Sequence, residues 1–234
     1  MIKRKLRKLF FILRGDGKNL FNKLVKVKKR WYGNQYGGFF ASPLFINDDS
    51  IVYSFGVGED ISFDLEIINK HNSTVFGFDP TPKSIKWISK QKLTNRFIFF
   101  EYGIAAKTGL VDFYLPKNLE NVSGSFVNQI NINLDSKIQV QMKSFYDLTR
   151  DLGHEHINIV KMDIEGAEYM VLENLLKSCI KIDQILIEFH DRFFPNGKEM
   201  TINSIKLLED HGYVLFGISD SLEELSFINR TLLN

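Results

Sequence analysis

The sequence predicts an α/β fold: a mostly parallel sheet with helices on both faces and an antiparallel strand near the end of the chain. From residue 51 onward, short apolar runs rich in β-formers alternate with segments of helical spacing, a pattern typical of parallel sheets with crossover helices. Two strand-like runs at 213–218 and 225–229, joined by a polar turn, predict a terminal antiparallel pair. The 234 residues, 44% of them hydrophobic, suffice to bury one full core.

The elements are expected in a simple order. Main strands are predicted at 51–55, 75–78, 97–101, 157–162 and 184–189, and accessory strands at 110–115 and 138–142, around a polar loop at 116–136. Helices are predicted at 61–69, 82–92, 144–152, 165–178 and 201–211. Pro82 suits a first helical turn, Ser144 caps its helix, and Gly153 and Gly212 end the helices that precede them.

The first strand, turn and helix have the order of a nucleotide-binding unit. Gly56 and Gly58 follow the strand, and Asp79 ends the next strand, 21 residues after Gly58. Glycines let a backbone approach a ligand, the helix N-terminus offers free N–H groups, and the acid can accept ribose hydroxyls. An ordinary turn between a strand and a helix is the alternative. Ile61 replaces the third glycine of a dinucleotide fingerprint, which favours S-adenosylmethionine over NAD.

Acidic side chains and a histidine follow two later strands. Asp163 and Glu165 come after the strand at 157–162, and Glu188 and His190 lie at the end of the strand at 184–189. Since ligands bind outside the carboxyl ends of parallel strands, these side chains are expected at one rim. His190 is predicted to be a general base for a substrate hydroxyl, with Asp163 or Glu165 orienting the acceptor. The alternative for His190 is a hydrogen-bonded histidine without chemistry.

Other interpretations of these acids stay open. Glu165 and Glu168 could only complement the dipole of the helix that follows, and we favour that reading for Glu168. Asp163 together with Glu188 or Asp191, and His190 alongside, could instead present ligands to Mg²⁺. This metal site is the weaker hypothesis, because the spacing of the acids is not specific. Lys161, within its strand, is expected to pair with a neighbouring acid or to serve the site.

At this point a family resemblance becomes specific. The chain resembles the FkbM-type S-adenosylmethionine-dependent methyltransferases over about residues 45–229, through the segments VYSFGVGEDISFD, FDPTPKSIKWI, KMDIEGAEYMVL and ILIEFH. The resemblance implies a class I methyltransferase (Rossmann-like) fold and methyl transfer to oxygen, often on sugars, polysaccharides or secondary metabolites. It also implies cofactor contacts at Gly56, Gly58 and Asp79. Ser54 stands where many methyltransferases have an acid, and Glu59 or Asp60 could substitute for it.

The expected function is therefore O-methylation of a hydroxyl, on a glycan or polysaccharide precursor, with S-adenosylmethionine as the methyl donor. One alternative is a nucleic-acid (RNA) methyltransferase that uses a basic arm. The segment MDIEG is not the Asn/Asp-Pro-Pro-aromatic motif of enzymes that methylate amino groups on nucleic acids. Another alternative is a non-catalytic module that binds an adenosine ligand at the membrane, although such a module needs no acids on the acceptor side.

Charge divides the chain into a basic arm and an acidic body. Residues 1–30 hold 12 Lys or Arg and one acid, whereas the remainder holds 18 basic and 27 acidic side chains. The arm is predicted to form two amphipathic helices, with 31–50 as a linker or lid and 51–234 as the methyltransferase domain. We favour an anionic membrane surface as its partner over nucleic acid or the domain itself. The protein is then expected in the cytoplasm, peripheral to the inner face of the membrane. Cys179 is expected to be a buried, inert thiol on a helix.

Overall fold

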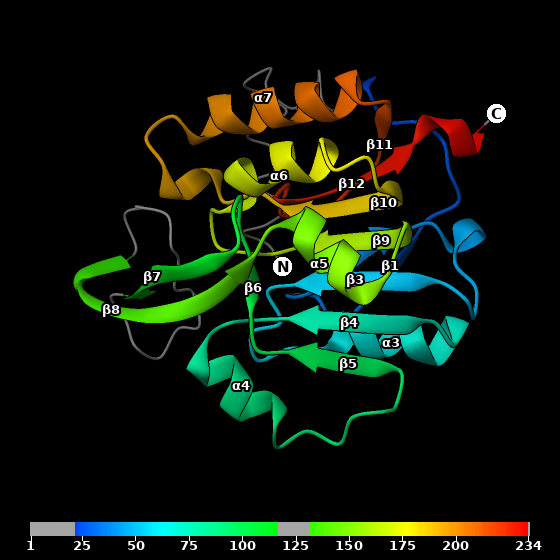
Figure 1. Cartoon of the computed structure of the whole chain (residues 1–234). Helices are drawn as coiled ribbons and strands as arrows, with labels where there is room; N and C mark the ends of the chain where they lie inside the picture. Colours follow the sequence, from blue (N-terminus) through cyan, green and yellow to red (C-terminus); the bar gives the residue numbers. More distant parts are fainter. Residues whose placement is uncertain (1–21, 117–131, 234) are drawn as a thin grey trace.

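The computed structural model describes residues 22–116 and 132–233 of the chain (Figure 1). Residues 1–21, which hold most of the predicted arm, and 117–131, which hold most of the predicted polar loop, lie outside the described residues. In the part of the chain that is described, no helix has the length and apolar character needed to cross a membrane.

The core of the molecule is one seven-stranded sheet in the order β11-β12-β10-β9-β3-β4-β5. Its neighbouring strands are parallel except for β12, which is antiparallel to both β10 and β11. The predicted α/β class, the parallel sheet and the terminal antiparallel strand are thereby confirmed. The strands are β3 (Ile51–Phe55), β4 (Thr74–Phe78), β5 (Phe97–Phe100), β9 (His156–Met162), β10 (Lys181–Glu188), β11 (Tyr213–Ile218) and β12 (Glu224–Asn229).

Helices cover both faces of this sheet, as the sequence predicts. One face packs against residues of α5, α6 and α7, such as Leu148, Leu172 and Leu208. The other face packs against α3 and the end of α4, through Phe63 and Ile88. The helices are α3 (Ser62–His71), α4 (Pro82–Ile88), α5 (Phe145–Leu152), α6 (Glu168–Leu176) and α7 (Gly197–Asp210). Short 3₁₀ turns occur at Pro43–Phe45, Asp191–Phe193 and Arg230–Leu233.

A hairpin of two short strands, β1 (Arg30–Tyr32) and β2 (Phe39–Ala41), completes the second face. Tyr32 and Phe39 are fully buried in the same cluster as Phe63 of α3. The side chain of Gln184 in β10 accepts a hydrogen bond from the Ser42 N–H at 2.7 Å and donates one to the Ser42 carbonyl at 3.2 Å. The segment predicted as a linker or lid is thus packed against the sheet over most of its length.

The segment before this hairpin follows the last part of the chain. The Val25 N–H donates to the Leu215 carbonyl of β11 at 2.9 Å, and the Lys29 ammonium donates to the Phe216 carbonyl at 2.8 Å. Lys23 forms an ion pair with Glu209 of α7 at 2.8 Å. Residues 23–29, which the sequence assigns to the arm, therefore contact the domain along α7 and β11.

A second, three-stranded sheet projects from the main one (Figure 1). It contains β6 (Gly103–Ile104), β7 (Gly109–Pro116) and β8 (Ile132–Lys143), so the two predicted accessory strands are present and longer than expected. Phe113, Val140 and Met142 form a small apolar cluster of their own with Ala105.

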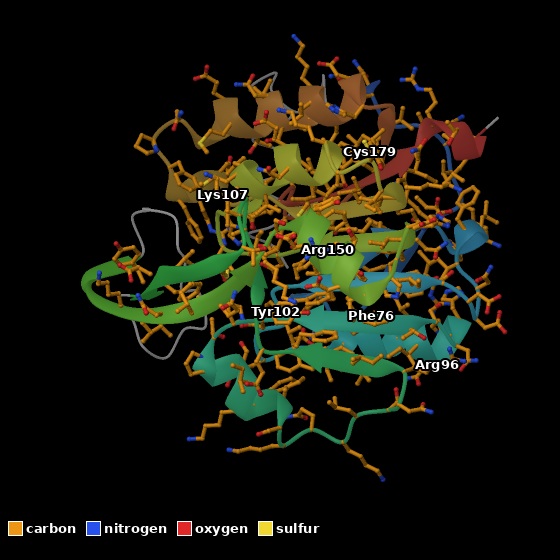
Figure 2. The ribbon with its side chains drawn as sticks, in the orientation of Figure 1. Phe76, Arg96, Tyr102, Lys107, Arg150 and Cys179 are labelled. Carbon is orange, nitrogen blue, oxygen red and sulfur yellow. The ribbon has the colours of Figure 1, made fainter. Side chains whose placement is uncertain are left out.

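Several helix ends differ from the sequence prediction, and α4 ends at Ile88 instead of at residue 92. Helix α6 begins at Glu168 rather than at 165, because Glu165 and Gly166 both have positive φ, 54° and 94°, which an α-helix does not allow. The helix ends at Leu176, so Cys179 lies beyond it with φ of 61° and is exposed (Figure 2). The expectation of a buried thiol on a helix is therefore wrong. Helix α7 begins at Gly197, four residues earlier than predicted.

Candidate active site

A cavity of about 260 Å³ opens at the carboxyl ends of β3, β4 and β9. The predicted cofactor residues Gly56, Gly58, Glu59, Asp60 and Asp79 all line it. Two predicted catalytic residues, Asp163 and Glu165, line it as well. The structure therefore brings the glycine turn and the acids after β9 into one cavity, as expected for the carboxyl edge of a parallel sheet.

The glycine turn is fixed by its neighbours as well as by its own conformation. Gly56 has φ of 77°, and a Cβ there would lie 1.7 Å from the Asp163 carbonyl oxygen. Gly58 has φ of 58°, but nothing lies within 4 Å of the position its Cβ would occupy. At Gly56 a side chain is excluded, because the backbone after β9 comes too close. At Gly58 no atom of the described residues fills the space where a side chain would lie, so a ligand can approach the backbone there. This open cradle fits a ligand held against the backbone.

Asp79 ties the glycine turn to the start of α4. One carboxylate oxygen accepts a hydrogen bond from the Gly58 N–H at 2.8 Å, and the other accepts from the Thr81 N–H at 2.9 Å and from its hydroxyl at 2.6 Å. Asp79 is 4% exposed and lines the cavity. A carboxylate has about four acceptor positions, so these three bonds leave capacity for a ribose hydroxyl.

The acids after the turn already have partners. Glu59 lies 3.3 Å from the Lys83 ammonium, and Asp60 accepts a hydrogen bond from the Asn34 side-chain amide at 2.6 Å. Ser54, which stands where many methyltransferases carry an acid, is fully buried in β3. Glu59 and Asp60 are therefore the acids placed to substitute for it, and both remain candidates for the amino group of the methyl donor.

Several residues of the cavity wall were not predicted from the sequence. Tyr36 and Gly37, at the tip of the β1–β2 hairpin, line the cavity together with the glycine turn. Ile104, Phe113 and Met142 come from the second sheet and add an apolar wall. Their placement depends on how the second sheet folds back onto the first, and no local pattern in the sequence indicates it.

His190 lies behind the cavity, where four carboxylates surround it. It is 1% exposed, and its Nδ1 lies 2.9 Å from Oε1 of Glu168, which is itself fully buried. Its Nε2 lies 3.4 Å from Glu165, 3.5 Å from Glu188 and 3.7 Å from Asp163. The structure thus gathers His190 and the three acids that the sequence assigns to the catalytic rim.

Glu168 is part of this cluster, which the sequence interpretation missed. Its Oε1 accepts a hydrogen bond from the Ile164 N–H at 2.9 Å in addition to its contact with His190. It does open α6, as the dipole interpretation requires, but its carboxylate turns back toward His190. The spacing of 22 residues between them gave no local signal, because the contact depends on β9 and β10 lying side by side.

The positions within the cluster separate two roles. Asp163 and Glu165 line the cavity, whereas His190 and Glu188 are not among the described residues that line it. The side chains placed to meet an acceptor hydroxyl are therefore the two carboxylates. His190 does not line the cavity itself, so its role as the base that meets the substrate stays a prediction.

Burial and charge act in opposite directions on His190. Burial lowers its pKa, but the carboxylates of Glu168, Glu165 and Glu188 outweigh burial and raise the pKa from 6.5 to about 10. Burial and the nearby Asp163 raise the pKa of Glu188 above its ordinary value, against the opposing effect of His190. The surrounding carboxylates therefore favour the protonated imidazole over the neutral one.

The raised pKa of His190 predicts how stability depends on pH. A group that binds its proton more tightly when folded stabilises the protein below its unfolded pKa of 6.5, and this contribution disappears as pH rises toward 10. We expect the free energy of unfolding to fall between pH 6.5 and 10, and to fall less in His190→Gln. Urea titrations in EDTA measure this, and equal slopes in both proteins would contradict it.

Lys161 supports the glycine turn from within the sheet. It is 3% exposed, its ammonium donates to the Gly56 carbonyl at 3.1 Å, and it lies 5.6 Å from the centre of the Phe39 ring. The acidic neighbour that the sequence analysis expected is Asp64. Burial raises the pKa of Asp64, and the positive charge of Lys161 opposes part of this rise. Lys161 thus holds the turn and the hairpin together beneath the cavity, and does not line it.

Several known proteins are similar to this chain. The human protein named "Probable methyltransferase-like protein 24" is 24% identical over 80% of this chain and 48% of its own length. "2-O-methyltransferase NoeI" of Sinorhizobium fredii is 25% identical over 53% of this chain and 56% of its own. The chain thus spans about half the length of these two relatives. The Methanococcus jannaschii fibrillarin structure, a pre-rRNA processing protein, aligns with 79% of this chain and 68% of its own, with a TM-score of 0.46 and 11% identity.

The family itself follows from a match that covers most of the chain. The family model described as "Methyltransferase FkbM domain" matches residues 50–215, from the start of β3 to the middle of β11. This span contains the glycine turn, Asp79 and the cluster around His190. The chain belongs to the FkbM methyltransferase domain family.

Proposed function

We propose that the protein is an S-adenosylmethionine-dependent O-methyltransferase that acts on a hydroxyl of a glycan or polysaccharide precursor. The observation that carries the proposal is the arrangement of one cavity. Gly58 and Asp79, which suit a nucleoside, lie in its wall together with the carboxylates of Asp163 and Glu165. A methyl donor bound by its ribose would therefore have acids beside the methyl group, where an acceptor hydroxyl must lose its proton.

The cavity suits the methyl donor in both shape and charge. Apolar side chains such as Ile104 and Met142 offer a surface for an adenine ring, and the Asp79 carboxylate is placed for ribose hydroxyls. When bound, S-adenosylmethionine supplies a methyl group on a positively charged sulfur. The carboxylates of Asp163 and Glu165 attract that charge, whereas the product has a neutral sulfur and is held less strongly.

Methyl transfer then needs alignment and removal of one proton. The acceptor oxygen forms a bond to the methyl carbon while the bond from that carbon to sulfur breaks. The proton of the hydroxyl passes to Asp163 or Glu165, the acids that line the cavity. The imidazole of His190 lies next to these two carboxylates, with its Nε2 3.7 Å from Asp163 and 3.4 Å from Glu165. In this proposal His190 is a positioning residue, and the two carboxylates are the candidate proton acceptors.

The choice of a glycan acceptor rests on the family and on charge. A relative named 2-O-methyltransferase supports transfer to oxygen. Beyond residue 30 the chain holds 27 acidic and 18 basic side chains, which disfavours contact of this part with a nucleic-acid backbone. RNA methylation is the alternative, because the 12 basic side chains of residues 1–30 could contact an RNA backbone.

Cofactor binding gives the first test. Asp79→Ala removes a charged partner of the ribose and is expected to weaken binding of S-adenosylmethionine by about 1.5–3 kcal/mol in calorimetry. Asp210→Asn, at the exposed end of α7, is the matched control and should bind like the unchanged protein. Equal affinity of Asp79→Ala and the control would remove the assignment of the cavity to this cofactor.

The acceptor is tested with a radiolabelled methyl group. Incubation with labelled S-adenosylmethionine and either lipid-linked oligosaccharides or total RNA should place the label in the carbohydrate. The linkage should survive mild alkali, as a methyl ether does and a methyl ester does not. Label in RNA instead of carbohydrate would contradict the proposed acceptor while leaving methyl transfer itself intact.

A further inference from the structure

The distances around Nε2 of His190 do not fit hydrogen bonds. An N–H···O bond joins atoms about 2.7–3.2 Å apart, and shorter still when both groups are charged. The carboxylate oxygens of Glu165, Glu188 and Asp163 lie 3.4, 3.5 and 3.7 Å from Nε2. The other ring nitrogen, in contrast, lies 2.9 Å from Glu168. Three acids thus face one buried nitrogen at nearly equal distances, and each is beyond ordinary hydrogen-bond range.

The same distances fit donor atoms arranged around a metal ion. Divalent metals take histidine nitrogen and carboxylate oxygen at about 2.0–2.2 Å. Two such donors at a tetrahedral angle lie about 3.4 Å apart, and at a right angle about 3.0 Å apart. The donor atoms of Asp163, Glu165 and His190 all lie within 4.8 Å of one another. Modest closure around an ion would therefore bring all three into bonding distance.

The orientation of His190 gives a second, independent indication. Its Nδ1 is held by Glu168 at 2.9 Å, and Glu168 is held in turn by the Ile164 N–H at 2.9 Å. A carboxylate on the far ring nitrogen fixes the tautomer in which Nε2 presents a lone pair, and metal-binding histidines are commonly held this way. His190 is 1% exposed, and Nε2 faces the acids that line the cavity.

We propose that Nε2 of His190 and the carboxylates of Asp163 and Glu165 bind a divalent cation at the rim of the cavity. One imidazole and two carboxylates form a mixed nitrogen and oxygen ligand set, which suits Mn²⁺ with water or a substrate oxygen in the remaining positions. The cation would supply positive charge next to the acceptor oxygen as it loses its proton. This catalytic role rests on the proposed O-methyl transfer, whereas binding of the cation does not.

A proton on Nε2 is the rival occupant of the same position. It would neutralise part of the acidic cluster and leave His190 a structural cation. The two occupants are distinguished by adding a metal, because a protonated imidazole does not bind one. Mn²⁺ alone is therefore the probe, and its binding to the full chain is measured by electron paramagnetic resonance and calorimetry at pH 7.5 after treatment with EDTA.

We expect one Mn²⁺ per chain, with binding lost in Asp163→Asn and in Glu165→Gln. Glu168→Gln should weaken binding about 10–100-fold, since it removes the carboxylate that orients His190 without removing a ligand. Asp191→Asn is the matched control and should bind normally, because the described groups that could hold a metal include Asp163, Glu165 and His190 but not Asp191. Circular dichroism and a cooperative urea unfolding transition show that each variant is folded.

Two results would overturn the proposal. One is no Mn²⁺ binding up to millimolar concentrations by unchanged protein that still binds S-adenosylmethionine. The other is equal Mn²⁺ binding by Asp163→Asn, Glu165→Gln and the control, which would place the ion elsewhere. Methyl transfer that continues in EDTA would overturn the catalytic role of the cation alone. Failure to bind S-adenosylmethionine, with Mn²⁺ binding intact, would instead contradict the proposed function.

Discussion

Replacing Asp163 by Asn is expected to lower kcat by about 10²–10⁴-fold, the range typical for loss of a group that takes a proton. Asp163 lines the cavity, its carboxylate lies 3.7 Å from His190, and the proposed mechanism makes it a candidate proton acceptor. Asn keeps the shape but accepts a proton poorly and carries no charge. Affinity for S-adenosylmethionine should change far less than kcat, because Asp79 and the glycine turn remain.

Steady-state kinetics with a saturating methyl donor measures this effect. Asp191→Asn is the matched control, since it removes an acid near the same rim without touching the group of Asp163, Glu165 and His190. An unchanged kcat in Asp163→Asn would exclude it as proton acceptor, and Glu165→Gln would then be the decisive variant. Loss of cofactor binding in Asp163→Asn, equal to its loss in kcat, would indicate that Asp163 binds the donor instead.

Replacing Gly56 by Ala is expected to destabilise the protein by about 3–5 kcal/mol, among the largest effects of a single substitution. Its φ of 77° costs an ordinary residue about 1–2 kcal/mol, and the added Cβ would stand 1.7 Å from the Asp163 carbonyl. That carbonyl belongs to the backbone after β9, so it can move only if β3 and β9 separate at this end. The clash therefore adds to the cost of the dihedral angle.

Gly58→Ala isolates the dihedral cost. Gly58 also has positive φ, 58°, but nothing lies within 4 Å of the position of its Cβ. We expect a loss of about 1–2 kcal/mol for Gly58→Ala. Urea titrations of both variants at one pH measure the difference. Equal losses at the two positions would show that the backbone after β9 yields to the new side chain, contrary to the rigid contact inferred here.

Local patterns were sufficient to predict the sheet and most helices. Each strand of the parallel sheet is a short apolar run, and the turns that follow contain glycine or proline, so the alternation is visible without tertiary information. The late start of α6 also had a local signal in the sequence, namely the glycine at position 166. Gly166 has φ of 94°, a backbone angle that glycine adopts easily and other residues rarely do. The neighbouring Glu165 also has positive φ, 54°, but a glutamate in the sequence does not indicate such an angle.

The parts that sequence reasoning missed depend on contacts between distant segments. Glu168 and His190 meet because α6 and the end of β10 lie over the same edge of the sheet, which no spacing between them reveals. Tyr32 and Phe39 fill the second core beside α3, although their Gly- and aromatic-rich surroundings resemble a loop. The acidic or basic character of each site residue was predictable from its type. The nearly complete burial of His190 was not predictable, because it depends on how α6 packs over the end of β10.

The contacts of residues 23–29 bear on how this chain can be shortened. Val25 continues hydrogen bonding onto β11, and Lys29 reaches the carbonyl of Phe216. A truncation at Trp31 would expose these backbone groups on a terminal strand and cut into β1, which begins at Arg30. Such a shortened protein would be prone to self-association for reasons unrelated to its charge. A cut before residue 22 keeps these contacts and separates the charge of the first twenty residues from the integrity of the sheet.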